Sequence, residues 1–97
     1  MYKVTVHIIS INDNDTVNLP LPKDVEKIIE KIKIIIPIPK RNVKEKLLLE
    51  FRDGLNSDTY ELPYPNNLFY ARRVRKVLEK IGIPVICEDY WIEIQNE

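Results

Sequence analysis

Cysteine and glycine are scarce in this chain. The single cysteine, Cys87, excludes an internal disulfide and leaves no spacing that predicts a metal site. The only glycines, Gly54 and Gly82, lie too far apart to form a glycine-rich phosphate-binding loop. The common nucleotide-binding enzymes are therefore excluded, and we expect no cofactor and no bound metal.

Net charge and long apolar runs are missing as well. Fifteen basic residues balance fifteen acidic ones, so no overall field attracts the protein to nucleic acid or to an acidic membrane. The longest apolar run, Ile34–Ile38, contains a proline, whereas crossing a membrane takes about 20 apolar residues. Residues Met1–Val4 lead straight into a strand pattern without the features of a signal peptide. We therefore expect a cytoplasmic protein with no membrane partner.

The most informative feature present is an internal near-repeat, about 1–40 and 44–97, within one α+β domain of 97 residues. The segment Asp15–Pro22 recurs as Asp58–Pro65 with five of eight positions identical. Apolar residues of the preceding segments correspond at the same spacing: Val4 with Leu47, Val6 with Leu49 and Ile8 with Phe51. We interpret the repeat as a duplication. The Lys, Glu and Ile bias suits a thermophile and an AT-rich genome equally well.

The first unit predicts a strand, a loop and a helix. Tyr2–Ser10 alternates apolar and polar residues, which is typical of a half-buried strand. Pro20 and Pro22 remove backbone donors and are expected to stop sheet pairing. A helix is predicted from about Lys23 until Pro37, although Ile34–Ile38 also fits a short edge strand. Its apolar stripe is Val25, Ile28, Ile29, Ile32 and Ile36.

The second unit predicts a hairpin, a helix and further strand. Glu45–Arg52 and Ser57–Leu62 form the hairpin. Asn66 or Asn67 is expected to cap the helix, and Gly82 is expected to end it in a left-handed conformation. The remaining strand segments are Ile83–Cys87 and Tyr90–Gln95.

This order of elements predicts a two-layer sandwich of ferredoxin-like type, built from duplicated β-α-β units. The pseudo-two-fold axis of such a fold is what a duplicated unit would supply. The alternative is a pair of tandem ββα units that share one antiparallel sheet. In that alternative, Thr16–Leu19 and Thr59–Leu62 are full members of the sheet.

Few residues suggest catalysis. Cys87 with His7 would make a nucleophilic pair, but no third orienting group is recognisable, and a lone strand cysteine is usually a small buried apolar residue. The acidic residues Glu88–Asp89, Asp13 and Asp15 are better explained as turn residues and solvated charge. A small hydrolase or nuclease is thus the weakest hypothesis, and we expect no enzyme activity.

Basic and aromatic residues of the second unit indicate binding instead. Arg72, Lys76 and Lys80 lie four residues apart on one side of the second predicted helix. Basic residues in such a line would hold phosphates of RNA or DNA, or else pair with the acidic strands of the protein itself. The first function predicted is a non-enzymatic interaction module, with itself or another protein as partner, and the alternative is a nucleic-acid-binding protein. A final strand left at the edge would pair across a two-fold axis as a homodimer. Candidate nucleic-acid or partner contacts are Tyr64, Phe69, Tyr70, Arg72, Arg73, Arg75, Lys76 and Lys80. Candidate edge-strand interface residues are Tyr90, Trp91, Ile92 and Ile94.

Overall fold

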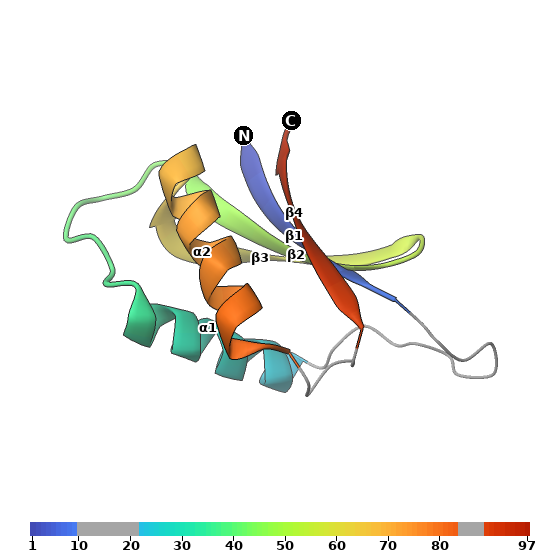
Figure 1. Ribbon diagram of the computed structural model, residues 1–97. Helices are drawn as coiled ribbons and strands as arrows, with labels where there is room; N and C mark the ends of the chain where they lie inside the picture. Colours follow the sequence, from blue (N-terminus) through green and yellow to red (C-terminus); the bar gives the residue numbers. More distant parts are fainter. Residues whose placement is uncertain (10–21, 84–88) are drawn as a thin grey trace.

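The computed structural model describes residues 1–9, 22–83 and 89–97, and these form an α+β fold (Figure 1). Within this part of the chain, no helix is long and apolar enough to cross a membrane. The elements in chain order are β1 (Tyr2–Ile8), α1 (Pro22–Ile35), β2 (Lys46–Asp53), β3 (Asn56–Pro65), α2 (Leu68–Ile81) and β4 (Tyr90–Asn96).

The described strands form one mixed sheet in the order β3-β2-β1-β4. β1 is parallel to β2, and the connection between them contains α1, because parallel neighbours need a crossover. β2 and β3 form an antiparallel hairpin whose turn contains Gly54 at a φ of 58°. β4 runs antiparallel to β1 with an unbroken register from Tyr2 opposite Asn96 to Ile8 opposite Tyr90.

Both helices cover the same face of the sheet (Figure 1). α2 packs against β1 and β4 and also contacts α1. α1 lies on the β2–β3 side, where the hydroxyl of Tyr64 in β3 donates to the carbonyl of Ile36 at 2.7 Å. The opposite face, which we call the uncovered face, carries no helix among the described elements. The two helices therefore divide the sheet between them, and α2 takes the half that ends at β4.

The core lies between the helices and the sheet, and the alternation of the strands decides which side chains enter it. Val4, Val6, Leu49 and Phe51 are fully buried on the helix side. Each such side chain contributes roughly 1.5–3 kcal/mol by burial. The helices supply Val25, Ile28, Ile32, Ala71, Val74, Val77 and Leu78.

The predicted helices are confirmed, with one alternative excluded. α1 buries the predicted stripe, except that Ile29 is only partly buried against the core. Ile34–Ile38 is not a strand: the helix runs to Ile35, and the residues that follow are a bend and loop. The physical reason is that Ile36 is buried and its carbonyl accepts the Tyr64 hydroxyl, which holds the end of α1 against the helix side of β3, so the segment does not join the sheet as a further strand.

The α+β class is confirmed, whereas the ferredoxin-like arrangement is not. The element order is that of a ferredoxin-like fold, but there the two strands of each β-α-β unit are split by another strand, whereas β1 and β2 are direct parallel neighbours. β3 therefore lies at the edge of the sheet beside β2 and not beside β1. The second unit follows the ββα alternative, since β2, β3 and α2 succeed one another, but the sheet is mixed rather than antiparallel. Thr16–Leu19 lies outside the described residues, as does most of Ile83–Cys87.

The prolines of the second unit do not end sheet pairing, contrary to the expectation for this motif. β3 continues through Pro63 to Pro65, which is paired with Lys46 after an irregularity between Lys46 and Leu48. Proline is tolerated here because β3 is an edge strand, where one side of the backbone needs no ladder partner.

Candidate interaction surfaces

The ends of α2 determine which of its side chains face outward. The Asn67 side chain accepts a hydrogen bond from the Tyr70 N–H at 2.9 Å and caps the first turn. At the other end, Gly82 adopts a φ of 71° and donates its N–H to the Leu78 carbonyl at 3.1 Å. With Val74 and Leu78 turned into the core, the polar residues of the helix are left on its outer side.

This outer side contains a shallow hollow of about 370 Å³, which we call the basic groove. Phe69 is 63% exposed there, a high value for a large aromatic side chain. The Arg73 guanidinium carbon lies 5.7 Å from the centroid of the Phe69 ring, within the range of a cation–π contact. The residues that line the groove are Leu68, Phe69, Arg72, Arg73 and Lys76, none of which is acidic.

The other predicted contacts of this region lie elsewhere. Tyr64 is fully buried, so it belongs to the core and is not available to a partner. Burial raises the pKa of its hydroxyl, against the opposing effect of the nearby Arg73 charge. Tyr70 is half-buried and stacks on Tyr64 with ring centroids 5.4 Å apart. Arg75 pairs with Glu79 at 4.0 Å, and Lys80 is exposed beyond the groove.

β4 has one bonded side and one open side within the described sheet. The Ile9 N–H donates to the Asp89 carbonyl at 3.0 Å, and the Glu97 N–H donates to the Met1 carbonyl at 2.9 Å. Bonded and non-bonded positions alternate along an antiparallel pair, so the odd-numbered residues of β4 bond to β1. The open side, which we call the β4 edge, presents the backbone groups of Tyr90, Ile92, Ile94 and Asn96.

The two edges of the sheet differ in how they resist pairing with another strand. β3 carries Pro63 and Pro65, the exposed acids Asp58 and Glu61, and an irregular register with β2. These features protect an edge strand. β4 contains no proline, one acid and no irregularity in its register. The predicted interface strand is therefore the unprotected edge of the sheet.

The predicted interface side chains lie on both faces of β4. Ile92 and Ile94 are partly buried on the helix side and pack against the core. Trp91 is 48% exposed on the uncovered face. Its ring stacks on that of His7 at a centroid distance of 3.9 Å and an angle of 9°. Trp91 is thus held in place by β1 even though half of its surface is open.

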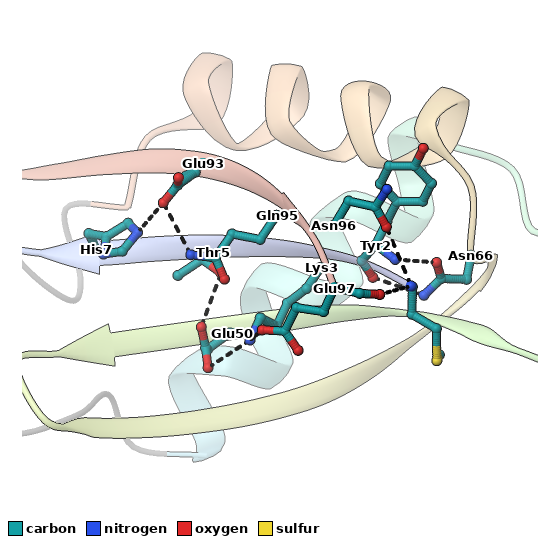
Figure 2. Close-up of polar contacts among 11 residues, drawn as sticks. Tyr2, Lys3, Thr5, His7, Glu50, Asn66, Glu93, Gln95, Asn96 and Glu97 are labelled. Carbon is teal, nitrogen blue, oxygen red and sulfur yellow. Dashed lines mark hydrogen bonds and ion pairs between the residues drawn. The ribbon is translucent and has the colours of Figure 1, made fainter.

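A polar cluster on the uncovered face was not predicted from the sequence (Figure 2). Thr5 is fully buried and Glu50 is 6% exposed, although no helix covers them. The Thr5 hydroxyl donates to Glu50 at 3.0 Å, and the Lys3 ammonium lies 3.4 Å from the other Glu50 oxygen and 3.0 Å from Glu97. Burial lowers the pKa of Lys3, but Glu97 and Glu50 outweigh it and raise the pKa.

His7 and Glu93 form the second part of this cluster. His7 Nε2 lies 2.9 Å from Glu93, and Gln95 donates to the same carboxylate oxygen at 3.2 Å (Figure 2). The hydrogen bond with His7, joined by that from Gln95, lowers the pKa of Glu93. Strand alternation places all of these residues on one face. Only the register, which sets His7 beside Trp91 and Thr5 beside Glu93 and Glu50, reveals the contacts.

Asn66 ties the starts of the central strands to α2. Its side-chain oxygen accepts from the Tyr2 N–H at 2.6 Å, and its amide donates to the Tyr2 carbonyl at 2.8 Å (Figure 2). The same amide lies 3.1 Å from the Lys46 carbonyl. The sequence predicts a cap at Asn66 or Asn67; the structure assigns the cap to Asn67 and a bridging role to Asn66.

The described residues show no catalytic constellation. Among residues 1–9, 22–83 and 89–97, no three His, Cys, Asp or Glu side chains gather as a metal site would require. Cys87, Glu88, Asp13 and Asp15 lie outside this part of the chain. His7, the imidazole of the hypothetical pair with Cys87, is engaged with Glu93. Searches against protein-family models, curated proteins and solved structures find no match to this chain.

Proposed function

We propose that the protein is a non-enzymatic interaction module that forms a homodimer by pairing the β4 edges of two copies. The observation that supports this most directly is the contrast between the protected β3 and the unprotected β4. Within the described residues, the open edge of β4, a strand of seven residues, offers a row of N–H and C=O groups without a partner strand. A second copy satisfies these groups with the same surface, as a two-fold interface requires.

Charge restricts the register of such a dimer. Pairing centred on Glu93 would set two carboxylates directly opposite each other, which is destabilising. Pairing centred on Ile92 sets Glu93 opposite the partner's Trp91, and pairing centred on Ile94 sets it opposite the partner's Gln95. Both of these registers are also centred on residues whose backbone groups point to the open side. We therefore expect one of the two.

The position of α2 adds a second contact to the same interface. α2 covers β1 and β4, whose axes lie about 4.8 Å apart, so its axis lies roughly 5 Å from a two-fold axis beside β4. Two copies of α2 would then run antiparallel about 10 Å apart, which is the upper end of normal helix packing. The flank of α2 turned away from α1 carries Leu68, Arg75 and Glu79. This flank therefore offers one charge of each sign to the partner's α2.

The proposal is tested by sedimentation of the wild type and of Ile92→Pro, with Ile92→Val as the matched control. Ile92 contributes no hydrogen bond to β1, so proline removes two bonds across the interface but none within the sheet. At about 1 kcal/mol each, their loss weakens dimerisation roughly 30-fold or more, while Ile92→Val remains dimeric.

A measurement on the unaltered protein guards against a misfolded variant. In a dimer, the amides of Ile92 and Ile94 are protected from hydrogen exchange, and the protection increases with protein concentration. A wild type that sediments as a monomer at high concentration, with both amides exchanging freely, would contradict the proposal.

A further inference from the structure

The two helices differ in how their basic residues are compensated. α1 has four basic residues, but three acids alternate with them, and Lys33 pairs with Glu30 at 3.5 Å. α2 has five basic residues and one acid. That acid, Glu79, pairs with Arg75, which lies outside the basic groove. The positive charge of the groove is therefore not offset by its own helix.

The acidic residues of the sheet do not offset it either. Glu93 is bonded to His7 and Gln95, while Glu50 and Glu97 hold Lys3 on the uncovered face, on the other side of the sheet from α2. Within residues 1–9, 22–83 and 89–97, no ion pair involves the arginines or the lysine of the groove. Intramolecular pairing with acidic strands thus does not account for these charges in the described part of the chain.

The spacing of the cations favours an extended ligand over a single small anion. Arg72, Lys76 and Lys80 are exposed at intervals of four residues, so successive charges lie about 6 Å apart along α2. Like charges at this spacing repel one another slightly and do not stabilise the helix. A linear polyanion that follows the helix would neutralise all three.

The exposed ring of Phe69 favours a polyanion that carries flat aromatic groups. Its ring is mostly exposed at one end of the charged line, and Arg73 lies over one side of it. A nucleobase that stacks on the remaining side would place the Phe69 ring between the base and the Arg73 guanidinium, and such stacking binds any base without reading its sequence. Bases are free to stack in this way in a single strand and not in an intact duplex. An inorganic polyphosphate has no such group to offer, and an acidic peptide has none at its charged residues.

We propose that the outer side of α2 binds single-stranded nucleic acid, with Arg72 and Lys76 of the basic groove and Lys80 beyond it contacting phosphates, and with Phe69, beside Arg73, stacking on a base. The inference does not require dimerisation, because the β4 edge is not part of the groove, and Leu68 is the one groove residue that also lies on the flank of α2 assigned to the dimer contact. In the dimer, two such grooves would lie on one side of the joined sheet.

The test is fluorescence anisotropy with a labelled 12-nucleotide DNA of mixed sequence, titrated at several salt concentrations. With about three phosphate contacts, the logarithm of the binding constant should fall with the logarithm of salt with a slope of roughly −2, and Lys76→Ala should reduce that slope by about 0.7. Phe69→Ala should weaken binding about tenfold or more through lost stacking. Because Phe69 and Lys76 are both exposed, neither variant should change the melting temperature by more than a few degrees.

Two controls separate this proposal from general attraction to anions. Lys27→Ala, on the compensated helix α1, should change the affinity less than twofold. Inorganic polyphosphate should lose affinity in Lys76→Ala but not in Phe69→Ala. The proposal is overturned if the DNA does not bind at low salt, if Phe69→Ala binds it as tightly as the wild type, or if a 12-base-pair duplex binds as well as the single strand.

Discussion

Replacement of Tyr64 by phenylalanine removes a single oxygen atom from the core. That oxygen donates to the Ile36 carbonyl at 2.7 Å and lies 3.4 Å from the Ile32 carbonyl. Ile32 already accepts from the Ile36 N–H at 2.8 Å, so its carbonyl keeps a partner after the change. The carbonyl of Ile36, at the end of α1, would be left buried without one.

The expected cost follows from that unpaired carbonyl. A buried acceptor that loses its only hydrogen bond destabilises a protein by about 2 kcal/mol. In a domain of this size, a change of that magnitude lowers the melting temperature by roughly 8–16 °C. Thermal unfolding followed by circular dichroism measures the shift, and the helical signal before the transition should stay near that of the wild type, because the ring of Tyr64 remains in place.

Tyr70→Phe is the matched control. Tyr70 stacks on Tyr64, but its hydroxyl makes no hydrogen bond with another described residue, so its loss should change the melting temperature by at most a few degrees. If Tyr64→Phe melts within 2 °C of the wild type, or if both variants lose the same amount, the hydroxyl does not anchor α1 and the argument is refuted.

Three further predictions concern the polar contacts of the sheet. Asn66→Ala removes the hydrogen bonds to Tyr2 in β1 and to Lys46 in β2. Urea titration should show a free energy of unfolding that is lower by about 2–3 kcal/mol, and an unchanged value would contradict the bridging role of Asn66. Thr5→Val leaves one oxygen of the buried Glu50 carboxylate without its donor and should cost about 1–3 kcal/mol in the same assay; an unchanged midpoint would contradict the burial of that carboxylate. Because the folded pKa of Glu93 lies below its ordinary value of 4.5, its interaction with His7 stabilises the protein above about pH 4.5, and this contribution is lost as the pH falls through the lowered value. Glu93→Gln should therefore melt below the wild type at pH 7, and the gap should narrow as the pH falls below 4.5; a gap that stays constant over that range would show that the side chain acts through packing instead.

Local patterns in the sequence were sufficient to predict where the helices lie and which face of each central strand is buried. The apolar residues at helical spacing in 68–81, the asparagine before them and the glycine after them each have a direct physical meaning. The structure confirms the helix, the Asn67 cap and a positive φ at Gly82, and it buries Ala71, Val74 and Leu78 while Leu68 and Ile81 are only half-buried. The same holds for the alternation of β1 and β2, which placed Val4, Val6, Leu49 and Phe51 in the core. These features depend on neighbours a few residues apart, so they can be read from the chain alone.

Sheet order depends instead on contacts between distant residues. In a ferredoxin-like fold a strand closes each β-α-β unit, and Ile34–Ile38 is one candidate for that strand in the first unit. Instead, the Tyr64 hydroxyl bonds to the end of α1 and holds it against β3. The equivalent position in the first unit is Leu21, which has no hydroxyl to make such a bond. A near-repeat in the sequence therefore does not have to produce repeated contacts.

The candidate surfaces divide in the same way. The sequence by itself determined that the basic residues lie on one helix and that a final strand is present, since both follow from local spacing. Only the tertiary structure decided that Tyr64 is buried while Phe69 is exposed, that β4 is an unprotected edge and β3 a protected one, and that Thr5 and Glu50 are buried on a face without a helix. The physical reason is that exposure is set by what packs against a side chain, and in a sheet those neighbours come from strands far away in the sequence.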